Sequence, residues 1–146
     1  MKYTQQIEIN LPREQVVQLI QDPDNLKHWQ RGFIALEHSS GNPGEKGATS
    51  VLKYQMGKRR IEMTEEILDV NWPEKFDVLY EARQVKNIQR NRFEELENNK
   101  TLWISEAEFK LSGPMKIMGL LMKGAFKKQS YRYLEDFKSF AEGSHP

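Results

Sequence analysis

The chain of 146 residues has the length of one domain, and its 22 Lys and Arg against 21 Asp and Glu give a formal net charge of +1. This balance provides no long-range field to attract nucleic acid or an acidic membrane, and the lack of cysteine excludes disulfides, thiolate metal sites and cysteine nucleophiles. The N-terminus has no apolar leader, and no segment approaches the roughly 20 apolar residues of a bilayer span. We therefore expect a cytoplasmic protein without stable membrane insertion.

The first thirty residues change from a strand pattern to a helical one. Apart from Gln5, residues 3–11 alternate between apolar or aromatic and polar side chains, which is typical of a strand with one buried face. Pro12 suits the first turn of a helix, and the apolar side chains of residues 16–20 share one helical face. Asp22 followed by Pro23 is a typical helix start, with the aspartate as the cap. We predict a strand followed by two short helices.

Residues 32–111 have an almost continuous strand pattern, interrupted by short stretches rich in Gly, Asn and Pro that favour turns. Because the connections are short, successive strands should be antiparallel neighbours. The six predicted strands are Phe33–Ser40, Ala48–Met56, Arg60–Val70, Phe76–Ala82, Val85–Leu96 and Thr101–Leu111.

Helix-forming residues from Met115 to Glu142 predict one long C-terminal helix, with Gly119 and Gly124 as the places where it could bend. In its second half, side chains at spacings of three and four form an amphipathic face that should dock on an apolar surface: Phe126, Ser130, Tyr133, Phe137 and Phe140. In residues 115–122, apolar side chains surround most of the helix. This segment should therefore be covered on several sides.

Four segments in this order carry a resemblance to a known family. Residues 7–16 combine an alternating strand, a proline, an acidic residue and a helix, and residues 22–29 form a second helix ending in tryptophan. Residues 41–47 form a glycine-containing turn, and residues 133–142 are similar to the C-terminal end of the last helix in that family. The chain thus resembles the START-like (SRPBCC) superfamily, which includes polyketide cyclase/dehydrase and lipid-transport proteins.

The resemblance implies an α+β helix-grip fold, in which a curved seven-stranded antiparallel sheet wraps round a long C-terminal helix. Two short helices follow the first strand, and residues 1–146 form a single domain. The family fold also implies a cavity between sheet and helix that binds lipids, polyketides or other apolar ligands. Members of the family act as carriers, sensors, cyclases or chaperone partners.

Strand alternation predicts which side chains face such a cavity. In the strand of residues 85–96, Asn87, Gln89 and Asn91 alternate with one lysine and two arginines, so we place the amides inside because burial of the cations would be costly. The amides could orient a hydroxyl or carbonyl of a ligand, or they could bond to neighbouring strands or water. The complete predicted ligand-binding wall is Tyr54, Met63, Tyr80, Asn87, Gln89, Asn91, Trp103, Met118 and Met122. Ordinary core packing is the alternative for each of them.

Met115, Met118 and Met122 give residues 115–122 flexible thioether side chains that would adapt to ligands of varied shape. We therefore expect this segment to gate the cavity. Two alternatives are core packing of the methionines and an exposed stripe that docks on a partner protein or a membrane surface.

Glu65 is the one carboxylate that the alternation turns inward. With Tyr54 or Tyr80 it could perform the acid and base steps of a cyclase. A salt-bridged or rim glutamate is the alternative, and we predict that Glu65 is not catalytic.

The remaining residues carry no recognisable catalytic pattern. His28, His38 and His145 are scattered without metal-ligand spacing, and no serine has the surroundings of a nucleophile elbow. We therefore expect no catalytic residue, no metal and no cofactor. The sequence favours a binder or carrier of an apolar small molecule. The alternatives are an aromatase/cyclase-like enzyme and a protein-interaction module like the family's chaperone partners.

Overall fold

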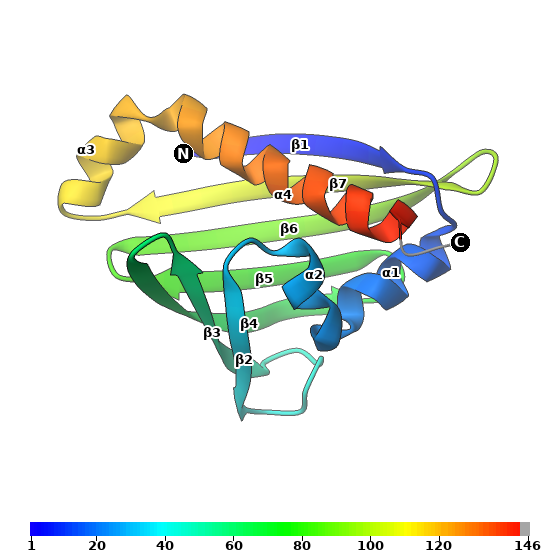
Figure 1. The fold of residues 1–146 in the computed structure, drawn as a ribbon, viewed down its shortest axis with the longest axis horizontal. Coiled ribbons are helices and arrows are strands. Elements are labelled where there is room, and N and C mark those ends of the chain that lie inside the picture. Colours follow the sequence, from blue (N-terminus) through cyan, green and yellow to red (C-terminus); the bar gives the residue numbers. More distant parts are fainter. Residues whose placement is uncertain (144–146) are drawn as a thin grey trace.

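Seven strands form one curved sheet round a long C-terminal helix, which confirms the predicted α+β helix-grip fold (Figure 1). This computed structural model describes residues 1–143, so the end of the predicted domain and His145 lie outside the described residues. The elements in chain order are β1 (Lys2–Ile9), α1 (Arg13–Gln21), the 3₁₀ helix η1 (Pro23–Asn25), α2 (Leu26–Trp29), β2 (Phe33–Ser40), β3 (Thr49–Met56), β4 (Arg59–Asn71), β5 (Lys75–Ala82), β6 (Val85–Leu96), β7 (Lys100–Leu111), α3 (Pro114–Leu121) and α4 (Lys123–Gly143).

The strands follow the order β1-β7-β6-β5-β4-β3-β2 across the sheet, and all neighbours are antiparallel. Strands β2 to β7 thus form a meander, as their short connections predicted. β1 closes the other edge by pairing with β7, from Lys2 opposite Glu108 to Ile9 opposite Thr101. The six predicted strands of this meander are confirmed, with ends that differ by one residue at most.

The two short helices after β1 also form as predicted, with small differences at their starts. Pro12 occupies the cap position just before α1. The Asp22 side chain accepts a hydrogen bond of 2.9 Å from the Asp24 backbone N–H, which confirms Asp22 as a cap. The second helix consists of η1 and the single turn α2.

The prediction of one continuous helix from Met115 to Glu142 is wrong, because the chain breaks between α3 and α4 at Met122, with φ −118° and ψ 26°. The helix therefore breaks at neither of the predicted glycines, Gly119 and Gly124. Gly119 instead lies so close to Leu111 that an added Cβ would stand 2.1 Å from the leucine Cδ1. This contact holds α3 against the end of β7, whereas α4 turns back over the sheet (Figure 1).

Residues 115–122 are also not covered as expected, because most of their apolar side chains are exposed in α3 and at Met122. No helix among residues 1–143 combines the length and the apolar character that a membrane crossing needs.

The core fills one end of the concave face, where the second half of α4 packs on β1, β6, β7 and α1. Phe137 is fully buried at its centre, with edge-to-face contacts to Trp29 and Trp103 at centroid distances of 5.1 and 5.4 Å. The buried cluster is Ile7, Ile9, Val16, Val17, Phe93, Trp103, Leu134, Phe137 and Ala141. Burial of each large apolar side chain contributes about 1.5–3 kcal/mol. This packing anchors the second half of α4 and leaves the centre of the concave face unfilled.

Candidate ligand-binding cavity

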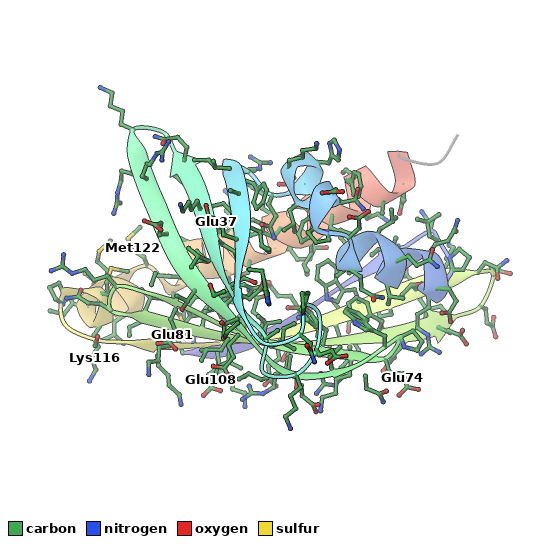
Figure 2. All side chains as sticks on the ribbon, turned by 90° about the horizontal axis from the view of Figure 1, so that it is seen from below. Glu37, Glu74, Glu81, Glu108, Lys116 and Met122 are labelled. Atoms are coloured by element: carbon green, nitrogen blue, oxygen red, sulfur yellow. The ribbon has the colours of Figure 1, made fainter. Side chains whose placement is uncertain are left out.

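A cavity of about 600 Å³ lies between the concave face of the sheet and the middle of α4. Its wall comes from all seven strands, from α2 and from Gln129, Ser130 and Tyr133 of α4. Figure 2 looks along the space between sheet and helices, into which side chains project from both sides. The volume falls within the usual range for small-molecule sites, roughly 300–1,000 Å³.

The structure brings seven of the nine predicted wall residues together round this cavity. They are Tyr54, Met63, Tyr80, Asn87, Gln89, Asn91 and Trp103. The placement of Met118 and Met122 on the wall is wrong, since neither lines the cavity and each is 46% exposed. The reason is the contact of Gly119 with Leu111, which turns α3 away from the concave face.

Asn91 is a structural amide. Its Nδ2 donates a hydrogen bond of 3.0 Å to the Phe76 carbonyl oxygen, and its Oδ1 accepts one of 3.0 Å from the Trp103 indole Nε1. The side chain therefore links β5, β6 and β7, which is the alternative that the sequence left open for these amides. With its amide nitrogen and oxygen both bonded, Asn91 shapes the wall and has little capacity left for a ligand.

Asn87 is different, because its Oδ1 is buried and has no hydrogen-bond partner within residues 1–143. An unpaired buried polar group costs about 1–3 kcal/mol, so a donor that reached this oxygen would recover that free energy. Asn87 lies on β6 opposite Tyr80 of β5 and Phe109 of β7, and all three side chains line the cavity. The amide is thus an acceptor available to a ligand.

A row of polar side chains crosses the cavity wall at this level. Ser50 on β3 lies opposite Glu65 on β4, Glu65 lies opposite Tyr80 on β5, and Tyr80 lies opposite Asn87 on β6. Residues opposite each other on antiparallel strands project from the same face, with Cβ atoms about 4.5–5.5 Å apart. These four side chains, the polar row, therefore form a continuous band within an otherwise largely apolar wall.

Burial raises the pKa of Glu65, and a hydrogen bond from the Tyr80 hydroxyl opposes that rise in part. The pKa of Tyr80 is raised far above its ordinary range, first by burial and then by the nearby Glu65 charge. Tyr54 also has a raised pKa, mainly from burial, and its hydroxyl donates a hydrogen bond of 2.6 Å to Gln30 Oε1. Both tyrosines therefore remain protonated donors at neutral pH.

Several wall residues were missed because they lie outside the alternating strands. Trp29 of α2 lines the cavity, and its indole Nε1 is buried without a hydrogen-bond partner among residues 1–143. Trp72 lies in the β4–β5 turn, where alternation gives no direction. Ser130 and Tyr133 belong to the α4 face that the sequence assigned to apolar packing. The helical spacing of that face could have identified both as wall residues, because the face lies opposite the concave side of the sheet, which forms the other wall of the cavity.

The histidines do not form a site with one another. His38 lines the cavity near its edge, where its Nε2 lies 2.8 Å from the Gly41 carbonyl oxygen, and His28 stacks on Phe140 at 5.7 Å. Among residues 1–143, no group of three or more His, Asp or Glu side chains is arranged to hold a metal ion.

A side crevice between the end of β3 and α4 continues from the cavity. Met56, Gln129 and Tyr133 line both of them. The outer part of the crevice is lined by Lys128 and Arg132, among other residues. The shared residues place the crevice directly beside the cavity, with the side chains of Met56, Gln129 and Tyr133 between the two.

Residues 1–142 match the family model described as polyketide cyclase / dehydrase and lipid transport. No curated protein matches the chain.

Solved structures with the same fold cover nearly the whole chain at low sequence identity. A conserved protein from Geobacillus kaustophilus is 17% identical with a TM-score of 0.82, and the match covers 100% of this chain and 98% of that one. The Zhui aromatase/cyclase from a Streptomyces species is 12% identical with a TM-score of 0.79, over 97% and 93% of the two chains. Norcoclaurine synthase from Thalictrum flavum, in complex with dopamine and hydroxybenzaldehyde, is 14% identical with a TM-score of 0.73, over 100% and 88%. At these low sequence identities, the similarity to the solved structures shows the fold alone.

Proposed function

Since this chain belongs to the polyketide cyclase/dehydrase and lipid-transport family, we propose that it binds and carries a small, largely apolar molecule between the sheet and α4. The observation that carries this proposal is the cavity of about 600 Å³, large enough for a lipid fragment or a polyketide. The ligand would contact the apolar and aromatic side chains Tyr54, Met63, Tyr80 and Trp103 together with the amides Asn87 and Gln89.

The polar row supports a more specific ligand chemistry. Asn87 Oδ1 is an acceptor without a partner within residues 1–143, and the neighbouring Tyr80 and Glu65 side chains already bond to each other. A ligand hydroxyl or amide N–H could donate to Asn87 while the ligand's apolar body fills the remaining volume. The raised pKa of Glu65 means that its surroundings disfavour the charged carboxylate, so the site suits a neutral polar group.

Native mass spectrometry of the purified protein tests the proposal, because a ligand held between the sheet and α4 can remain bound through purification. We expect a bound small molecule, and tight binding of the apolar dye Nile red after delipidation. Ala107 is 4% exposed on the cavity face of β7, so Ala107→Phe should fill part of the cavity and weaken Nile red binding at least about tenfold. Ala35→Phe on β2, outside the cavity wall, is the matched control and should bind as the wild type does.

A chain that retains no small molecule would contradict the proposal if Ala107→Phe and Ala35→Phe also bound Nile red equally. Thermal unfolding of each variant shows whether a loss of binding reflects a loss of folding instead.

A second candidate function is an acid and base enzyme of the aromatase/cyclase kind. The observation that favours it is the Glu65 and Tyr80 pair, a carboxyl with a raised pKa bonded to a phenol inside the cavity. We keep the prediction that Glu65 is not catalytic. The Tyr80 hydroxyl is bonded to Glu65, and the four residues of the polar row include no histidine and no second carboxylate to act as the partner acid or base.

Glu65→Gln separates the two functions and also gives a pH signature. The folded pKa of Glu65 lies above its unfolded value, so wild-type stability should fall as the pH rises from the ordinary glutamate pKa through the raised one. The amide that replaces the carboxyl cannot ionise, so the variant should lack this fall and be more stable than the wild type at neutral pH. Each unit of raised pKa corresponds to about 1.4 kcal/mol. Urea unfolding below and above this pH window measures the difference.

Nile red affinity of the Glu65→Gln variant should stay within about twofold of the wild type, because glutamine resembles the neutral carboxyl in shape and polarity. Turnover of a polyketide substrate by the wild type, lost in this variant with binding intact, would instead favour the cyclase.

A further inference from the structure

Large exposed apolar side chains gather on one segment of the molecule. Seven are exposed among the described residues, and five of them lie between residues 117 and 122. Leu120 and Leu121 are 80% and 81% exposed, and Ile117 is 64% exposed. Gly119 is buried against β7, so the apolar side chains on either side of it cover the outward face of α3. In water this face is unfavourable unless something covers it.

The stretch of chain that surrounds these apolar side chains is strongly basic. Residues 109–134 contain six basic side chains and no acidic one, although the whole chain has a net charge of +1. None of the six forms a salt bridge within the described part of the chain. They are Lys110, Lys116, Lys123, Lys127, Lys128 and Arg132. The rest of the chain is therefore net acidic, and the charge is separated within the molecule.

The basic segment can be placed in the fold. Figure 2 shows Lys116 and Met122 at one end of the molecule, where Glu81 of β5 also lies, and Glu74 at the other end. The β3–β4 turn adds Lys58, Arg59 and Arg60 to the basic side, since Met56 at the end of β3 and Ala125 of α4 line the same crevice. Basic and exposed apolar side chains thus share one end.

We propose that α3 and the start of α4 dock on the surface of an anionic lipid bilayer. The exposed apolar side chains of α3 would enter the region between headgroups and acyl chains, and the surrounding lysines would meet the anionic headgroups. Five of the six basic residues are lysines, whose long apolar stems let the charge reach the headgroups while the helix lies deeper. Protein interfaces are depleted in lysine, so the composition favours a bilayer over a protein partner.

Docking at this end would bring the side crevice close to the bilayer. Lys128 and Arg132 line the crevice, and Gln129 and Tyr133 line both the crevice and the cavity. An apolar ligand could then pass between bilayer and cavity along α4. The docking itself does not rest on the proposed ligand binding, because α3 lies outside the cavity wall.

Vesicle flotation tests the docking with the full chain. We expect the wild type to bind vesicles of equal parts phosphatidylcholine and phosphatidylglycerol, more weakly as salt is raised, and to bind pure phosphatidylcholine vesicles poorly. Leu120→Ser with Leu121→Ser should lower the partition coefficient on the anionic vesicles at least about tenfold. Lys123→Gln with Lys128→Gln should lower it about twenty-five-fold, since each basic residue near an anionic surface is worth about fivefold.

Matched controls change the same residue types elsewhere on the surface. Lys27→Gln with Lys46→Gln removes two exposed charges from α2 and the β2–β3 loop, and Ile34→Ser removes an exposed apolar side chain from β2. Both controls should bind anionic vesicles within about twofold of the wild type. Equal binding by the α3 variants and the controls would overturn the proposal.

Failure of the wild type to bind anionic vesicles would also overturn it. A measurement of molecular mass in solution would then show whether a second copy of the chain covers α3, and a monomer would point to a different protein partner. Removal of the cavity ligand should leave vesicle binding unchanged, so a failed docking test and a failed ligand test are distinguishable.

Discussion

Phe137→Ala should lower the free energy of unfolding by about 3–5 kcal/mol, a large part of the roughly 5–15 kcal/mol of a typical domain. Phe137 is fully buried, and its ring contacts Trp29, Trp103 and Phe140. Loss of the ring leaves a hole where α4, α2 and β7 meet, which rigid neighbouring rings cannot fill. Urea unfolding followed by tryptophan fluorescence measures the change.

Tyr131→Ala is the matched control for this prediction. Tyr131 is also an aromatic residue of α4 but is 36% exposed, so its loss should change the free energy of unfolding by less than about 1 kcal/mol. Equal effects of the two substitutions would contradict the assignment of the core to the Phe137 face of α4.

Asn91→Ala should lower the free energy of unfolding by about 2–4 kcal/mol, because the substitution leaves one buried and one partly buried group without their partner, and an unpaired buried group costs about 1–3 kcal/mol. These groups are the Trp103 indole N–H and the Phe76 carbonyl oxygen. Water entering from the cavity would recover a part of the loss. Thermal and urea unfolding measure the change, and near-ultraviolet circular dichroism reports on the environment of the Trp103 ring.

Asn87→Ala is the control with the same chemistry on the same strand face. Its Oδ1 has no partner within residues 1–143, so the loss of this amide should change the free energy of unfolding by less than about 1 kcal/mol. It should instead weaken ligand binding. If Asn87→Ala destabilised the protein as much as Asn91→Ala, the division between a structural and a ligand-facing amide would be wrong.

The sequence predicted the sheet well because alternation and turn residues are local signals. In β6, the cost of burying cations was enough to place Asn87, Gln89 and Asn91 on the cavity side, as the structure has them. The polar partners of these amides depend on strand register. Trp103 reaches Asn91 because β7 pairs with β6 at a particular offset, which no spacing within one strand reveals. The family resemblance did not depend on register, and the family match over residues 1–142 confirms it.

The placement of residues 115–122 could not be predicted from helix propensity. Good helix formers continue through Met122, and the break there follows from two packing contacts that orient α3 and α4 differently. Gly119 fixes α3 on Leu111, while Phe137 fixes α4 in the core. The even charge balance was similarly uninformative, because a total of +1 is compatible with a basic end and an acidic remainder.

The pairing of β1 with β7 gives this chain an order of assembly. β1 is the first strand to be synthesised, yet its sole neighbour in the sheet of the described residues is the last, with Lys2 opposite Glu108. Ile7 and Ile9 likewise find their core partners on α4, near the end of the chain. The meander from β2 to β7 can pair hairpin by hairpin as it leaves the ribosome, because its contacts are local. The N-terminal strand lacks its partner until β7 has been made, so we expect closure of the sheet edge and the docking of α4 to be late, mutually dependent events.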